Sequence, residues 1–186
     1  VLSMMPGSIR CVKARSSSSS PLTSTCLLRI CTVSPGVPTF AALEDAERAG
    51  VPIWGEVELA VRTVNARSLA AGRETPRLVA IGGTNGKSTV TSLVGALLAR
   101  SGRSTFVGGN LGEPLAAHAD RPFDALVVEV SSFQMERVDA FHPESAVLLN
   151  ITPDHLDRYP DVAAYAHAKG NAFLRQTGDD LAIVPI

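Results

Sequence analysis

Residues 78–88 read Leu-Val-Ala-Ile-Gly-Gly-Thr-Asn-Gly-Lys-Ser and decide the fold. The first four residues form a short apolar run, which predicts a buried strand. The glycines that follow allow a tight turn whose backbone N–H groups can point at one anion. Apolar residues then recur at helical spacing up to Gly102, and this pattern predicts an amphipathic helix. They are Val90, Leu93, Val94, Leu97 and Leu98.

The turn itself, residues 83–88, has the chemistry of a phosphate loop. Lys87 would reach the terminal phosphates of a nucleotide, and the Ser88 hydroxyl would help to hold Mg²⁺. The strict pattern needs a glycine where this chain has Ile81, so only the shorter Gly-x-x-Gly-Lys-Ser form is present. A glycine-rich turn with a solvated lysine is the alternative, but the strand–loop–helix context favours nucleotide binding. The predicted contacts are Gly83, Thr84, Asn85, Gly86, Lys87, Ser88 and Thr89.

Outward from this loop, strand and helix patterns alternate. Apolar runs at residues 125–130, 146–151 and 181–184 predict strands, and residues 161–175 predict a helix. This alternation predicts an α/β fold with a parallel sheet flanked by helices, with ligands beyond the carboxyl ends of the strands. Upstream, residues 39–49 and 56–64 are helical candidates, and residues 66–76 are a predicted linker at a domain boundary.

The overall composition fits a globular protein: 45% of residues are hydrophobic, 19% are charged and the formal net charge is −1. This balance argues against general binding to nucleic acid or anionic membranes. Residues 1–31 differ, because they are basic, rich in serine and free of acidic residues. Such a leader resembles an organellar transit peptide in composition, although a disordered or mistranslated segment is the reading we prefer. The three cysteines all lie in this region and suggest no disulfide framework.

Two further places after predicted strands carry acidic groups. Glu129 lies near the end of an apolar strand, where a carboxylate is costly to bury unless it is paired or binds a metal. A solvent-facing edge residue is the alternative. Residues 154–159, Asp-His-Leu-Asp-Arg-Tyr, follow the next strand. They offer carboxylate, imidazole and guanidinium groups, or simply a polar loop that caps the next helix.

Lys169 interrupts an apolar helical stripe. Its neighbours on the stripe are Val162, Tyr165, Ala166 and Phe173. A lysine in this place either extends to solvent or, if desolvated, has a lowered pKa and a reactive neutral amine. Such an amine can react with CO₂ to give a carbamate, which would act as a metal-binding carboxylate.

Four motifs in this order resemble the Mur ligase family. They are IGGTNGKST at residues 81–89, GGNLG at 108–112, EVSSFQME at 129–136 and NITPDHLDRY at 150–159. The chain is similar to the branch of that family that adds D-glutamate, over residues 33–184. The resemblance implies a P-loop-containing central ATP-binding domain at residues 77–186. Residues 32–76 would be the remnant of a Rossmann-like domain that binds a UDP-linked substrate.

The resemblance also implies site residues and cofactors. ATP and two Mg²⁺ ions would be bound, with Lys87, His155 and Lys169 as catalytic residues. The first ion would be held by Ser88 and Glu129, and the second by His155 and carbamylated Lys169. The substrate-binding residues would be Ser34, Gly36, Asn110, Ser131 and Gln134.

The implied reaction joins UDP-N-acetylmuramoyl-L-alanine to D-glutamate through an acyl phosphate in peptidoglycan synthesis, in a cytoplasmic monomer. The chain departs from the family where Gly82 replaces a usual threonine. It also shows no glycine-rich UDP-binding turn before Ser34, and it ends at Ile186, within the central domain. We therefore expect a truncated chain without the C-terminal domain and with little ligase activity. The alternatives are a non-catalytic nucleotide-binding fragment, another Mur-type or folylpolyglutamate synthase-like enzyme, or a P-loop phosphotransferase.

Overall fold

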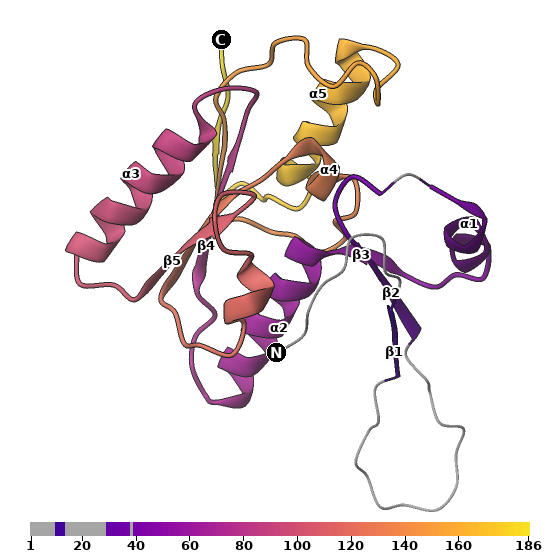
Figure 1. Ribbon diagram of the computed structural model, residues 1–186. Helices are drawn as coiled ribbons and strands as arrows, with labels where there is room; N and C mark the ends of the chain where they lie inside the picture. Colours follow the sequence, from indigo (N-terminus) through magenta and orange to yellow (C-terminus); the bar gives the residue numbers. More distant parts are fainter. Residues whose placement is uncertain (1–9, 14–28, 38) are drawn as a thin grey trace, which may run out of the picture.

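The computed structural model describes residues 10–13, 29–37 and 39–186. Its main feature is a sheet of five strands, which are all parallel to their neighbours, in the order β5-β6-β4-β7-β8 (Figure 1). The strands are β4 (Arg77–Gly82), β5 (Thr105–Gly109), β6 (Ala125–Glu129), β7 (Ser145–Leu148) and β8 (Leu181–Ile183). Because the strands are parallel, their carboxyl ends share one edge of the sheet, where ligands bind in such folds.

Helices cover the two faces of this sheet (Figure 1). The helix α2 (Glu56–Ala70) packs on one face, where Val57, Val61 and Val64 join the main hydrophobic core with Leu78 and Leu126. The 3₁₀ helix η1 (Leu115–His118) lies beside α2 and adds Leu115 to that core. The helix α3 (Lys87–Arg100) lies on the other face. It approaches β5 closely, since a Cβ added at Gly95 would lie 2.3 Å from a Val107 methyl carbon.

A smaller sheet precedes this unit. It contains β1 (Arg10–Lys13), β2 (Arg29–Val33) and β3 (Ile53–Gly55), with β2 and β3 parallel and the helix α1 (Ala41–Arg48) between them. Its own small core consists of Cys31, Val33 and Leu43. The strand β3 leads directly into α2, and the N–H of Gly55 donates to the carbonyl of Arg137 (2.9 Å), which ties the smaller sheet to the segment that follows α4.

Two helices lie at the carboxyl edge of the large sheet, α4 (Ser132–Met135) and α5 (Val162–Gly170). The 3₁₀ helix η2 (Asn171–Phe173) follows α5 and buries Ala172 in the main core. Tyr159, Tyr165 and Ala168 form a third buried cluster at this edge, packed against Phe133. This aromatic cluster contacts the predicted site, because Tyr165 lies beside both Thr84 and Lys169.

The predicted α/β class and the strands at 125–130, 146–151 and 181–184 are confirmed, and no end of these strands is shifted by more than three residues. The linker predicted at 66–76 is wrong in its first half, because α2 continues to Ala70 with Ser68 buried. The helix predicted at 161–175 ends at Gly170 and continues as η2, and the helix predicted at 39–49 is α1. The prediction missed β3, β5 and α4, which are three to five residues long.

The leader predicted at residues 1–31 lies largely outside the described residues. Within it, β1 pairs antiparallel with β2, so Arg10 lies opposite Thr32. Among the helices of the described part, none is both long and apolar enough to cross a membrane.

The domain boundary at residue 76 stays a prediction. The helix α2, which precedes this boundary, packs against the large sheet, which follows it.

Candidate phosphate and metal site

The phosphate loop, residues 83–88, connects β4 to α3 and needs glycine at two positions. Gly83 has a φ of 141° and Gly86 has a φ of 84°, and L side chains rarely adopt either conformation. A Cβ added at Gly83 would also lie 3.1 Å from the Cβ of Leu149. The first N–H groups of α3 have no partner within the helix, so they are available to an anion at this loop.

Asn150 holds the loop in shape. Its Oδ1 accepts from the N–H groups of Thr84 (3.2 Å) and Asn85 (2.9 Å), and its Nδ2 donates to the Asn85 carbonyl (3.0 Å). The Thr84 hydroxyl adds contacts to Thr152 and to the Tyr165 hydroxyl (3.2 Å). No role was predicted for Asn150, which fell inside the strand predicted at 146–151, whereas β7 ends at Leu148.

Ser88, Glu129 and Asn110 come together beside the loop. Glu129 is 3% exposed, and its Oε2 accepts from the Ser88 hydroxyl (2.8 Å) while its Oε1 accepts from Asn110 Nδ2 (2.9 Å). The reading of Glu129 as a solvent-facing edge residue is wrong, because β6 lies inside the sheet between β5 and β4. Carboxylate and hydroxyl oxygens are the ligands that Mg²⁺ prefers, so this group fits the first predicted ion.

Lys169 is buried beneath the loop. It is 5% exposed, its Nζ donates to the Gly83 carbonyl (2.8 Å) and lies 4.5 Å from the centre of the Tyr165 ring. The reading of a lysine that extends to solvent is therefore wrong. Burial, and after it the positive charge of Lys87, lower the pKa of Lys169 to about 8, although the carboxylates of Asp154 and Glu129 act in the opposite direction. A pKa near 8 leaves part of the amine neutral and nucleophilic at neutral pH.

Lys87 lies at the start of α3, with its side chain folded over the loop. Its Nζ donates to the carbonyl of Thr84 (2.9 Å), three residues earlier. The ammonium group is therefore placed beside the backbone that would surround a phosphate. A phosphate oxygen could replace this carbonyl as the acceptor, and the charge-assisted bond would then be stronger.

His155 lies beside the aromatic cluster and contacts two of its rings. Its ring is 4.9 Å from Phe133 and 6.0 Å from Tyr165 between centroids, and its Nε2 is 3.7 Å from Asp154 Oδ2. Tyr165 is thus a common neighbour of His155 and Lys169. Among the described residues, no three His, Cys, Asp or Glu side chains lie close enough to hold a metal ion. A second ion would need the carbamate of Lys169 and phosphate oxygens as further ligands.

The predicted substrate residues fall into two places. Ser131 and Gln134 form a capping box on α4, in which Ser131 Oγ accepts from the Gln134 N–H and Gln134 Oε1 accepts from the Ser131 N–H. Ser34 and Gly36 lie in a tight turn closed by the Val37 N–H and the Ser34 carbonyl (3.3 Å). A Cβ added at Gly36 would lie 3.7 Å from the Phe133 ring, so this turn faces α4.

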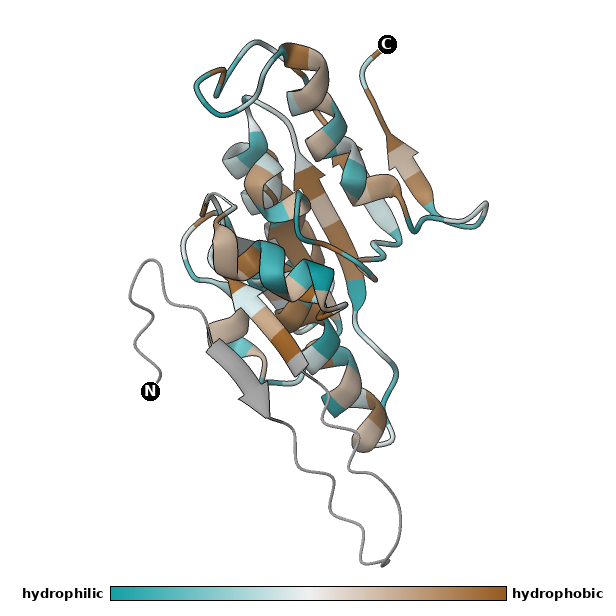
Figure 2. Ribbon diagram, turned by 90° about the vertical axis from the view of Figure 1, so that its right-hand side faces the viewer, coloured by the Kyte–Doolittle hydropathy of each residue, from teal (hydrophilic) through white to brown (hydrophobic). Residues whose placement is uncertain are grey.

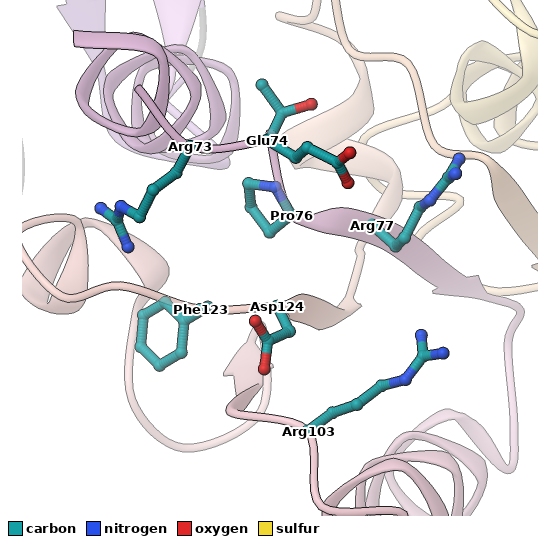
Figure 3. A pocket seen from close by; sticks show the side chains of 8 residues that line it. Arg73, Glu74, Pro76, Arg77, Arg103, Phe123 and Asp124 are labelled. Carbon is teal, nitrogen blue, oxygen red and sulfur yellow. The ribbon is translucent and has the colours of Figure 1, made fainter. Parts of the chain in front are cut away.

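A hollow of about 560 Å³ lies away from all these residues (Figure 3). It opens where β4 and β6 begin, so it occupies the amino edge of the sheet and not the edge that carries the phosphate loop. Asp124 in this hollow accepts from the Ser104 N–H (2.8 Å), and Arg77 is 3.7 Å from Glu144. The hollow brings together no residue that the sequence predicted as functional. It is lined by Arg73, Glu74, Thr75, Pro76, Arg77, Arg103, Phe123 and Asp124.

The chain is similar in sequence to curated proteins that are named as ligases. A UDP-N-acetylmuramoylalanine–D-glutamate ligase from Anaeromyxobacter dehalogenans (strain 2CP-C) is 53% identical over 153 residues, which are 81% of this chain and 31% of that protein. The ligase of the same name from Myxococcus xanthus (strain DK1622) is 48% identical over 155 residues, 82% of this chain and 32% of that protein. The chain therefore spans about a third of the length of these relatives.

Solved structures share the fold. One is the UDP-N-acetylmuramate:L-alanyl-gamma-D-glutamyl-meso-diaminopimelate ligase from Neisseria meningitides, with a TM-score of 0.52, 16% identity, and coverage of 82% of this chain and 51% of that chain. Another is the MurF ligase from Thermotoga maritima in complex with ADP, with a TM-score of 0.51, 18% identity, and coverage of 82% and 42%. The family model of the Mur ligase middle domain matches residues 81–186. The chain belongs to the Mur ligase family.

Proposed function

We propose that this chain carries the ATP-phosphate site of a ligase that adds D-glutamate to UDP-N-acetylmuramoyl-L-alanine in peptidoglycan synthesis. One observation carries the proposal: the buried carboxylate of Glu129 meets the Ser88 hydroxyl at the end of the phosphate loop, above a buried Lys169. The relatives at 53% and 48% identity bear the name of that ligase. Because the matched region is only about a third of each relative, the complete activity belongs to a protein of their length.

The proposed reaction has two steps. A carboxylate oxygen of the UDP-linked substrate attacks the γ-phosphorus of ATP, ADP leaves, and an acyl phosphate forms. The amine nitrogen of D-glutamate then attacks the acyl carbon, inorganic phosphate leaves, and the nitrogen loses a proton. Lys87 and the loop N–H groups hold the phosphates in line with the carboxylate, so this chain contributes positioning and charge stabilisation. These substrates occur in the cytoplasm, where we place the reaction.

Two magnesium ions would complete the proposed site. Ser88 and Glu129 would hold the first ion, and His155 and the carbamate of Lys169 would hold the second. When bound, Mg²⁺ would screen the repulsion between the phosphates and the attacking carboxylate. The lowered pKa of Lys169 supports carbamate formation, since the neutral amine is the form that reacts with CO₂.

The substrate side of the proposal depends on residues around α4. Asn110, which donates to Glu129, would lie nearest the phosphates. Ser131 and Gln134 would set the position of α4 through their capping box and contact the substrate from its N-terminal end. Ser34 and Gly36 would contact the UDP portion, because their turn faces α4 from the smaller sheet.

Calorimetry with Mg²⁺-ATP tests the proposal on the purified chain. Lys87→Ala removes one charged hydrogen-bond donor to phosphate, worth about 1.5–3 kcal/mol, so the Kd should rise about tenfold to a hundredfold. Arg100→Ala, at the exposed last position of α3, is the matched control and should leave the Kd unchanged. Absence of binding by the wild-type chain, or equal binding by Lys87→Ala, would contradict the proposal. Binding without turnover would restrict the function of this chain to holding the nucleotide.

A further inference from the structure

The backbone of His155 needs support from its surroundings. Its φ is 52°, the left-handed conformation that residues other than glycine adopt at a cost. The His155 carbonyl accepts from the N–H groups of both Arg158 and Tyr159, each at 2.9 Å, which closes a tight turn. The side chain of His155 is 44% exposed, so its own burial does not hold it in place.

The carboxylate of Glu136 accepts hydrogen bonds from the two residues that close this turn, Arg158 and Tyr159. Its Oε1 accepts from the Tyr159 hydroxyl (2.6 Å), and its Oε2 accepts from Arg158 Nη2 (3.0 Å). The Tyr159 hydroxyl and the Arg158 guanidinium are the donors of these two bonds, and the carboxylate of Glu136 accepts both. Both carboxylate oxygens are therefore used on the backbone turn that carries His155.

Glu136 is itself held firmly. It directly follows α4, and its N–H donates to the Ser132 carbonyl (3.1 Å), while the capping box fixes the start of the same short helix. Phe133, on that helix, stacks on Tyr159 at 5.9 Å with an interplanar angle of 9° and also contacts the His155 ring at 4.9 Å. The ring contacts and the carboxylate thus hold the turn from the same element.

We infer that Glu136 is a positioning residue, which fixes the His155 ring toward the second metal site by clamping Arg158 and Tyr159. The inference rests on the proposed role of His155. Glu136 touches neither the phosphate loop nor Lys169 in the contacts of the described residues, so it acts through His155. The four-residue helix α4 would then set both the substrate side, through its capping box, and the metal side, through Glu136.

The first test is NMR of the histidine rings. The chain has four histidines, so their ring nitrogens give few signals, and His155→Gln identifies the signal of interest. Glu136→Gln keeps the side-chain size but cannot accept both bonds, and it should shift or broaden the His155 signals alone. Asp139→Asn is the matched control, because Asp139 is also ion-paired but with Arg62 and Arg175. Unchanged His155 signals in Glu136→Gln, or equal changes in Asp139→Asn, would overturn the inference.

The second test measures Mn²⁺ binding by electron paramagnetic resonance in the presence of a non-hydrolysable ATP analogue. Loss of an outer partner of a metal ligand should weaken binding of the His155-dependent ion about tenfold. In a His155→Gln background, Glu136→Gln should have no further effect, because the two residues act in series. An equal loss in both backgrounds would assign Glu136 a general structural role and overturn the inference.

The two tests separate this inference from the proposed function. If wild type and His155→Gln bind Mn²⁺ equally, the metal role of His155 fails, whereas the NMR result still decides whether Glu136 positions the ring. If Glu136→Gln does not fold, Tyr159→Phe removes one hydroxyl from the same clamp and is read in the same way. A normal His155 signal in folded Tyr159→Phe would also count against the clamp.

Discussion

Two lysines, Lys87 and Lys169, lie beside the phosphate loop, and each donates a hydrogen bond to a different carbonyl of that loop. Lys169 donates to the Gly83 carbonyl at the start of the loop, while Lys87 donates to the Thr84 carbonyl one residue later. Burial and the charge of Lys87 together lower the pKa of Lys169 to about 8. The charge of Lys87 thus helps to keep Lys169 partly neutral.

This coupling predicts that Lys87→Ala raises the pKa of Lys169 above 8, toward the usual 10.5. NMR titration of the Lys169 side chain measures the midpoint, and Lys87→Arg, which keeps the charge, should leave it near 8. Because the folded pKa is below the unfolded value, the unfolded chain binds the proton more tightly. Protonation therefore disfavours the fold, and the contribution of Lys169 to stability should improve as pH rises from about 8 to about 10.5. Equal midpoints in wild type and Lys87→Ala would contradict the coupling.

At the scale of elements, the phosphate loop is held in place by the packing of α3 on β5 and β6. Gly95 lies in the middle of α3, where a side chain would meet Val107 on β5. Glycine lowers helix propensity by about 1 kcal/mol relative to alanine, so this position favours close packing over local helix stability. The start of α3 carries Lys87 and Ser88, and its distance from the sheet sets how near Ser88 lies to Glu129.

Gly95→Ala should therefore destabilise the fold, although alanine favours helices. The added Cβ would lie 2.3 Å from a Val107 methyl carbon, and overpacking of this kind costs about 1–3 kcal/mol. Urea unfolding measures the change, and Ser92→Ala on the exposed side of the same helix is the control. Adding Val107→Ala to Gly95→Ala should restore much of the loss. A stabilised Gly95→Ala variant would show that α3 can move away from β5 freely.

For the whole molecule, the relevant surface is the edge of the large sheet formed by β8. The strand β8 pairs with β7 on one side, and Leu181, Ile183 and Val184 are 54%, 47% and 56% exposed. Figure 2 shows hydrophobic residues along this edge strand near the C-terminus. Exposed apolar edge strands template pairing with other chains. The resemblance to Mur ligases implies a monomer, whereas this edge favours association of the chain as it stands.

We predict that the chain self-associates with rising concentration and that Ile183→Lys reduces this association. A lysine on an edge strand disfavours pairing because its charge must be desolvated between strands. Leu69→Lys is the control, since Leu69 is 65% exposed on α2, away from the edge. Sedimentation velocity over a range of concentrations measures the effect. A wild-type monomer at all concentrations, or equal effects of the two substitutions, would contradict the prediction.

Much of the fold and part of the site could be predicted from local patterns. The runs at β4, β6 and β7 are apolar enough to predict buried strands. Gly83 and Gly86 predict a loop, and both adopt a positive φ that L side chains rarely take. The strand β5 was missed because Gly108 and Gly109 interrupt its apolar run, and α4 was missed because four residues form one helical turn and show no periodicity. The length of α2 was missed because packing on the sheet keeps its last turn helical.

The sequence by itself determined the α/β class, the phosphate loop, and the residue types that suit phosphate and magnesium, because these depend on spacing along the chain. Tertiary structure alone decided that Glu129 is buried against Ser88 and Asn110, that Lys169 lies beneath Gly83, and that Asn150 holds the loop. It also decided that Glu136 clamps the turn of His155. These contacts join residues 19 to 86 positions apart, and only the strand order of the folded sheet brings such residues together.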